Sequence, residues 1–153
     1  MSKKKNKDKG IFNNKRVFFD FEIFEKIEAG IILTGTEVKS IRSGKISMNG
    51  SFCIIMDNEL FIRGMDIALY DEGSMNNHEP KRDRKLLLHK KQIEKLKIRL
   101  EERGLTIVPI KLYENDKSIF KIEIGVAKGR KNADKRNYIK DRESRKEMKE
   151  ITG

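Results

Sequence analysis

The chain has 153 residues and a mass of 17.9 kDa, which is the size of one ordinary domain. Lys and Arg (35 residues) outnumber Asp and Glu (24), and the resulting charge of +11 and pI of about 9.7 favour an anionic partner. The single Cys53 excludes an internal disulfide framework, and the sequence contains neither a membrane-length apolar run nor a signal-type leader. We therefore expect a cytoplasmic protein without a membrane partner.

The first elements are a polar tail and two strands. Residues 1–12 are basic and almost free of apolar side chains, so they are predicted to be a disordered tail. Apolar residues then alternate with polar ones, which predicts a half-buried strand starting at Val17 and containing Val17, Phe19, Phe21 and Ile23. A separate strand is expected from Gly30 to Leu33.

A short helix and a hairpin come next. Thr34 and Glu37 have the spacing of a capping box, and Gly44 is a typical C-terminal stop, so a helix is predicted between them. Asp57 and Asn58 tolerate positive φ and predict a tight turn. This turn joins two antiparallel strands, Ser51–Met56 and Glu59–Met65.

Residues 71–84 are rich in turn-forming and polar residues and are predicted to be a mobile surface loop. A helix is expected to follow and to end at Gly104. Its apolar stripe consists of Leu86, Leu87, Ile93, Leu96 and Leu100. Its lysines lie mostly off this stripe, which predicts an amphipathic helix with a basic outer face. These lysines are Lys90, Lys91, Lys95 and Lys97.

Two β-rich runs, Leu105–Tyr113 and Ile119–Ala127, are joined by a turn over Asn115–Ser118. Short, regularly spaced strands with few helices predict a mainly β (α+β) fold, a small antiparallel barrel of the oligonucleotide-binding (OB) type. We assign this barrel to residues 13–129. Residues 130–153 contain few apolar side chains and are interpreted as a basic tail.

The basic charge is concentrated in three runs. Residues 1–16 hold seven Lys and Arg against one acid, residues 81–99 nine against two, and residues 128–149 ten against four. Clustered cations bind polyanions by releasing their counterions, whereas a single basic run is often only a solvated face. Three separate runs favour nucleic acid as the partner.

Catalytic and metal sites are not expected. His78 and His89 lack a recognisable nucleophile, and Glu25, Glu28 and Glu37 are not spaced to share one face of an element. One cysteine and two histidines cannot complete a conventional zinc site without carboxylates. Cys53 lies among bulky apolar residues and is interpreted as core. We therefore predict no enzyme activity, cofactor or metal.

Four blocks of the sequence resemble the SsrA-binding protein family (small protein B), the protein partner of transfer-messenger RNA. They are Glu28–Lys45 (EAGIILTGTEVKSIRSGK), Arg84–Lys90 (RKLLLHK), Val126–Lys131 (VAKGRK) and Asp134–Arg136 (DKR). The match runs from about Asn14 to Arg145. The resemblance implies a six-stranded antiparallel OB-like barrel with two or three helices. It also implies a C-terminal tail that is unstructured in the free protein and helical on the ribosome.

The resemblance implies two sets of contact residues. Those that would contact the RNA are Asn14, Lys15, Glu28, Lys39, Arg42, Leu87, Lys121 and Lys128. Those of the ribosome-contacting tail are Lys131, Asp134, Lys135, Arg136, Tyr138, Ile139, Lys140 and Arg142. Lys and Arg suit phosphates, and an exposed Leu can support an unstacked base. Glu28 is expected to accept hydrogen bonds from base amino groups or 2′-hydroxyls, or to orient a neighbouring cation.

Three residues depart from the common family pattern. Ala133 stands where many relatives have an aromatic or imidazole group, which leaves Tyr138 as a candidate for stacking on decoding-centre bases. Phe19 and Phe21 replace residues that are often His and Tyr, so stacking capacity remains but a hydrogen bond to RNA there is lost.

The function that the resemblance implies is trans-translation. The protein would bind the tRNA-like domain of transfer-messenger RNA and stand in for the missing anticodon arm. Its partners would be that RNA, the decoding centre and message channel of the ribosome, and elongation factor Tu, with no role for DNA. Two alternatives remain open: another ribosome- or tRNA-binding barrel protein, and an RNA-processing enzyme.

Overall fold

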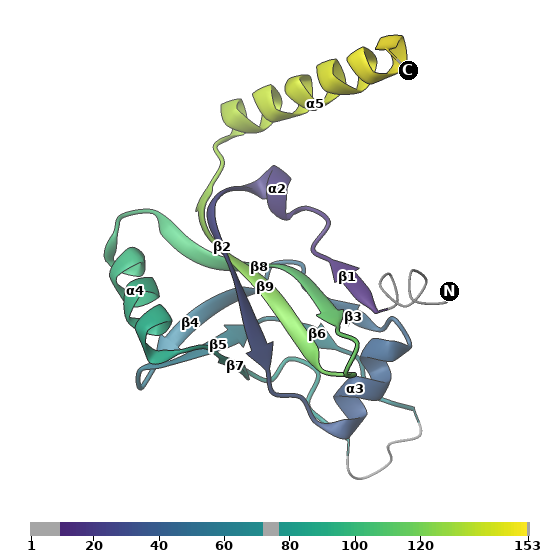
Figure 1. Ribbon diagram of the computed structural model, residues 1–153, viewed down its shortest axis with the longest axis vertical. Helices are drawn as coiled ribbons and strands as arrows, with labels where there is room; N and C mark the ends of the chain where they lie inside the picture. The colour runs from purple at the N-terminus through teal and green to yellow at the C-terminus, as the bar shows by residue number, and fades with distance from the viewer. Residues whose placement is uncertain (1–9, 72–76, 153) are drawn as a thin grey trace.

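Six of the strands pair into one closed ring (Figure 1). A computed structural model describes residues 10–71 and 77–152, with side chains through Glu143. Six antiparallel strands follow one another in the order β8, β4, β5, β7, β2 and β9, and β9 pairs back with β8. Their bounds are β2 Phe21–Ile31, β4 Phe52–Met56, β5 Glu59–Arg63, β7 Arg84–Leu87, β8 Leu105–Glu114 and β9 Phe120–Gly129. Because a sheet closed on itself is a barrel, the predicted fold class is confirmed.

Three short strands and four helices complete the described residues. Strand β1 (Ile11–Asn13) pairs with β8, and β3 (Ile46–Ser47) pairs with β6 (Asp66–Ile67). The helices are α2 (Val17–Asp20), α3 (Gly35–Arg42), α4 (Lys90–Glu101) and α5 (Asn132–Thr152). Helices α2, α3 and α4 accompany the ring, in agreement with the two or three helices expected with the barrel, and α5 lies in the tail. The predicted disordered tail is wrong for Ile11 and Phe12, which belong to β1, and residues 1–9 lie outside the described part of the chain.

Several local signals predicted the structure correctly. The side chain of Thr34 accepts a hydrogen bond from the backbone of Glu37, and Glu37 Oε1 accepts one from Thr34 N at 2.8 Å, which is the expected capping box of α3. Asp57 and Asn58 have φ of 51° and 60° and form the turn between β4 and β5. The hairpin of β8 and β9 is also confirmed.

The strand predicted to start at Val17 is wrong, because residues Val17–Asp20 form helix α2. The N–H groups of Phe19 and Asp20 both donate to the carbonyl of Arg16, which turns the chain. Val17 is buried against Val108 and Ile110 on the outside of the ring. This tertiary contact outweighs the alternating pattern. Strand β2 then runs without a break through Gly30, where a separate strand had been expected.

The helix start predicted near Leu86 is also wrong. Leu86 and Leu87 belong to β7, in which Leu86 pairs with Leu60 of β5 and Ile31 of β2. The three consecutive leucines there fit a strand as well as a helix, and closing the ring between β5 and β2 requires the strand. Helix α4 begins only at Lys90.

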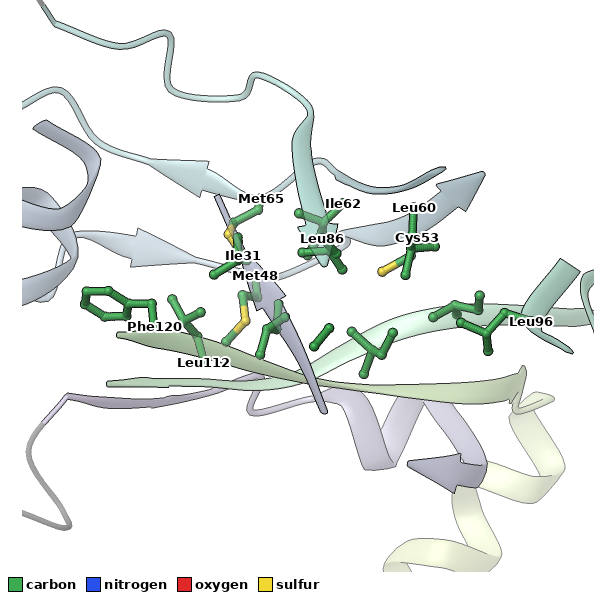
Figure 2. Close-up of a cluster of buried hydrophobic side chains, with 14 of the residues drawn as sticks. Ile31, Met48, Cys53, Leu60, Ile62, Met65, Leu86, Leu96, Leu112 and Phe120 are labelled. Carbon is green, nitrogen blue, oxygen red and sulfur yellow. The ribbon is translucent and has the colours of Figure 1, made fainter. Parts of the chain in front are cut away.

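The core fills the space between facing strands of the ring (Figure 2). Leu60, Ile62, Ile107 and Ile122 have no exposed surface. Cys53 belongs to this core, as predicted, and burial raises the pKa of its thiol far above the ordinary range.

A smaller cluster anchors α2 outside the ring. Val17, Val108, Ile110 and Ala127 are buried there, and Phe21 and Ile23 pack against them. Gly125 lies beneath this cluster, where a Cβ would come within 2.9 Å of Ile23 Cγ2 and 3.0 Å of Ile110 Cδ1. The close packing of strands and helix here therefore requires glycine.

Helix α5 leaves the end of β9 and extends past α2 (Figure 1). The structure thus contains a helix in the segment for which the sequence predicted a helix on the ribosome. That this segment is unstructured in the free protein stays a prediction.

Candidate nucleic-acid interface

Strand register gathers three of the predicted RNA-contacting residues on the outside of the ring. Gly30 of β2 is paired with Leu87 of β7 on one side and with Lys121 of β9 on the other, and Lys121 is paired with Tyr113 of β8. Glu28 lies two residues from Gly30 on β2 and therefore faces the same way. We call Glu28, Leu87, Tyr113 and Lys121 the strand surface.

Hydrogen bonding and exposure give the strand surface a defined chemistry. The hydroxyl of Tyr113 donates to the carboxylate of Glu28. Lys111 Nζ lies 5.5 Å from the centre of the Tyr113 ring. Leu87 is 51% exposed, and a Cβ on Gly30 would come within 3.2 Å of Leu87 Cβ. The surface thus combines an exposed apolar side chain, cations and an oriented carboxylate, which suits an unstacked base and its backbone.

Tyr113 is a residue that the sequence analysis missed. The alternating pattern of β8 placed it on a strand, but only the hairpin register could have placed it beside Lys121. Lys111 and Glu123 were missed for the same reason: they pair with each other, and Glu123 pairs with Glu28.

Helix α3 brings Arg42 to the end of the strand surface. Arg42 donates to both carboxylate oxygens of Glu114, from Nε at 3.3 Å and from Nη2 at 2.9 Å, and this carboxylate raises the pKa of the guanidinium. Glu114 follows Tyr113 directly on β8. Lys39 lies one turn before Arg42, with its Nζ 5.4 Å from the centre of the Tyr70 ring.

A buried ion cluster fixes α3 to the loop before β7. Glu37 and Arg84 are both fully buried and paired, and Arg82 Nη2 lies 2.5 Å from Glu37 Oε1. Burial favours the neutral carboxyl, but hydrogen bonds from Arg82, the Thr34 backbone and Arg84 outweigh it and hold the pKa of Glu37 below its usual value.

The loop predicted to be mobile is therefore fixed in its described part. Arg84 also donates to the carbonyls of Met65 at 2.7 Å and Pro80 at 2.9 Å. His78 is buried, with Nε2 2.8 Å from the Ile67 carbonyl and Nδ1 2.9 Å from the Thr36 hydroxyl. Residues 72–76 of the same predicted loop lie outside the described residues.

Asn14 and Lys15 lie apart from the strand surface. Asn14 Nδ2 donates to the Pro109 carbonyl at 2.9 Å, and its backbone N–H donates to that of Ile110 at 2.8 Å, so Asn14 fixes the chain to β8. Both residues line a groove of about 590 Å³ between residues 11–16 and the segment 44–49.

Lys128 is also separate. It lies seven residues from Lys121 on β9, about 23 Å along the strand, and pairs with Glu22 and Leu105. Its Cε would lie 3.7 Å from a Cβ on Gly104, at the end of the loop that follows α4. The predicted basic face of α4 is exposed on this side of the ring, at Lys90, Lys91, Lys95 and Lys97. The eight RNA-contacting residues therefore do not form one continuous patch.

The predicted tail residues divide into two groups. Lys135 and Tyr138 are partly buried against α2, and Phe19 of α2 lies beside Tyr138. Phe21 packs on the cluster beneath α2. The remaining predicted tail residues are exposed. They are Lys131, Asp134, Arg136, Ile139, Lys140 and Arg142, and Ala133 is exposed beside them.

Comparison with known proteins identifies the family. The family model described as "SmpB protein" matches residues 11–153. The chain belongs to the SmpB family. SsrA-binding protein of Thermosipho melanesiensis is 49% identical over 140 residues, which cover 92% of this chain and 95% of that protein. SsrA-binding protein of Pelobacter propionicus is 47% identical over 141 residues, or 92% of each chain.

A solved structure supports the SmpB fold. It is described as "tmRNA-SmpB: a journey to the center of the bacterial ribosome", and its matching chain is 42% identical, with a TM-score of 0.69, over 85% of this chain and 94% of that chain. The resemblance drawn from the sequence blocks is thus confirmed. SmpB is a family of RNA-binding proteins.

The described residues hold neither a cluster of metal ligands nor a helix suited to a membrane. Within residues 10–71 and 77–152, no three His, Cys, Asp or Glu side chains are grouped so that they could hold a metal ion. No helix in the described part of the chain combines the length and apolar character needed to cross a membrane.

Proposed function

We propose that this protein binds the tRNA-like domain of transfer-messenger RNA and acts in trans-translation. The observation that carries the proposal is the strand surface, where β-sheet register joins Glu28, Leu87 and Lys121, residues far apart in the sequence. Membership of the SmpB family and the tmRNA–SmpB structure support it.

In this role the protein supplies shape and charge and has no catalytic part. The barrel stands in for the missing anticodon arm and helps to deliver the RNA, together with elongation factor Tu, to a stalled ribosome in the cytoplasm. The basic residues of α5 and the segment before it then contact the decoding centre and the empty message channel, while peptidyl transfer is left to the ribosome. The exposed basic side chains of Lys131, Arg136, Lys140 and Arg142 suit such an RNA surface.

Two measurements test this function. Sequencing of the RNA that co-purifies with the tagged full-length protein should reveal one enriched RNA with a tRNA-like domain. In a binding assay with that domain, Lys121→Ala should weaken affinity about tenfold or more, and Lys95→Ala, which removes the same charge from exposed α4, should have a much smaller effect. Equal losses of affinity in both variants, or enrichment of ordinary tRNA alone, would favour the alternative function, that of another tRNA-binding barrel protein.

A further inference from the structure

The base of the tail is attached to α2 by backbone and charged contacts. The N–H of Arg130 donates to the Asp20 carbonyl at 2.9 Å, and Arg130 Nε donates to the Phe18 carbonyl at 3.1 Å. One turn into α5, Lys135 Nζ lies 3.4 Å from Asp20 Oδ1. Asp20 therefore receives both the strand-to-helix connection and the first turn of α5.

Aromatic side chains continue this contact. The rings of Phe19 and Tyr138 are 6.5 Å apart and tilted by 58°. Arg130 lies 4.7 Å from the centre of the Tyr138 ring, and Lys135 and Arg16 lie 5.4 and 5.1 Å from that of Phe19. Each cation is in range of a ring face, where the ring quadrupole attracts it.

The burial pattern of α5 agrees with a one-sided attachment. Lys135 and Tyr138 are partly buried, whereas Arg136, Asn137 and Ile139 are exposed. Helix α2 is itself held on the ring by Val17, which is 2% exposed in the cluster above Gly125. The contact therefore joins the tail to a part of the fold that is firmly packed.

We propose that α2 is a docking platform for the tail. Its positioning residues are Phe19, which contacts Tyr138, and Asp20, which contacts Lys135. These contacts set the direction in which α5 leaves the ring. This inference deepens the proposed function, on which its consequence for the ribosome rests, because a basic tail reaches the message channel only if its first turn points there. Phe19 serves here as an intramolecular ring contact for the tail, which the sequence-based expectation of stacking on RNA did not include.

The platform implies that the first turns of α5 are ordered without RNA, in contrast to the sequence-based expectation that the whole tail is unstructured in the free protein. The full-length protein can be tested for this order. Spin labels on Asn137→Cys and Glu94→Cys, both exposed, report the distance between the first turns of α5 and helix α4. Buried Cys53 does not compete for the label. We expect one narrow distance distribution in the parent and a distribution at least twofold broader with Phe19→Ala.

Two matched controls keep the test specific. Phe18→Ala removes a neighbouring exposed ring of α2 that lies near Lys26 and not near Tyr138, and it should leave the distribution narrow. Asp20→Asn removes only a charge and should broaden the distribution even if Phe19→Ala proves poorly folded by circular dichroism. An equally broad distribution in the parent, or an unchanged one in both Phe19→Ala and Asp20→Asn, would overturn the platform.

A second readout connects the platform to function. In a reconstituted tagging reaction, Asp20→Asn should lower the rate severalfold, because the Asp20 side chain holds Lys135 of the tail. Phe18→Ala should leave the rate unchanged, and affinity for the tRNA-like domain should stay within twofold in both variants. Equal tagging rates would contradict the functional consequence of the platform. Failure of the parent protein itself to bind the RNA would instead contradict the proposed function and leave the distance result standing.

Discussion

Glu37 and Arg84 form an ion pair in which neither side chain is exposed to water. The pair joins α3, which carries Lys39 and Arg42, to the start of β7, which carries Leu87. It therefore fixes the relative positions of two elements that contribute to the candidate interface.

Removal of one partner of this pair should destabilise the fold strongly. Glu37→Ala leaves Arg84 as a buried charge without its partner, and we expect the free energy of unfolding to fall by about 3–5 kcal/mol. Glu59→Gln, which breaks the half-exposed pair with Lys85, should cost less than about 1 kcal/mol. Urea unfolding of both variants measures the difference, and similar losses would contradict a special role of the buried pair.

The same carboxylate predicts a pH dependence. Because the pKa of Glu37 is lower in the folded chain than its ordinary value of 4.5, its contribution is fully present above that value and is lost as the pH falls through the folded pKa. The stability difference between the parent and Glu37→Gln should therefore stay constant from pH 7 to about 5.5 and shrink below about pH 4.5. Unfolding curves across this range test the sign, and a difference that grows in acid would refute it.

RNA affinity should depend on salt and on apolar contact in separable ways. Log affinity for the tRNA-like domain should fall linearly with log salt concentration, and Lys121→Ala should reduce the slope by about 1 because one phosphate contact is lost. Leu87→Ala should weaken affinity but leave the slope unchanged, because leucine displaces no counterions. Salt titrations of the three proteins measure both quantities; a flat dependence would exclude the electrostatic interface.

The carboxylate of Glu28 should act together with Tyr113. Glu28→Ala should weaken RNA binding and change the free energy of unfolding by no more than about 0.5 kcal/mol, since the residue is exposed. Tyr113→Phe removes the donated hydrogen bond, so the double variant should lose less affinity than the sum of the single losses. Tighter binding after removal of Glu28 would show that the carboxylate only repels RNA.

The barrel and the tail should be separable. A chain that ends after Gly129 keeps every strand of the ring and should bind the tRNA-like domain with nearly unchanged affinity, but it should not support tagging of stalled peptides. Binding and tagging assays on the same preparation measure the two activities. Tagging at the full rate by the truncated chain would show that the tail is dispensable.

Local signals in the sequence predicted local structure well. Thr34 and Glu37, at the i and i+3 positions of a capping box, were sufficient to predict the N-terminal cap of α3. Asp57 and Asn58 were sufficient to predict a hairpin turn. Val17 and Leu86 were assigned wrongly because their structure depends on partners distant in the sequence, Val108 and Leu60 respectively. The buried environment of Glu37 was invisible for the same reason.

The face of β8 on which Tyr113 lies depends on the exact register of the β8–β9 hairpin. A four-residue turn over Asn115–Ser118 would pair Glu114 with Ile119 and set Tyr113 opposite Phe120, which is buried. The actual loop is one residue longer, so Glu114 pairs with Phe120 and Tyr113 with Lys121. A shift of one residue exchanges the two faces of a strand. The individual contact residues came from the family resemblance, and their grouping came only from the structure.

The closure of the ring has a consequence for the synthesis of this protein. Strand β9 is the last strand to be made, and it covers one edge of β2 and one edge of β8. A nascent chain that lacks it holds two open strand edges, which invite pairing with other chains. A message for this protein cut short before the codons of β9 would therefore yield a product that cannot close its ring, and such a truncated message is the kind of defect that trans-translation clears.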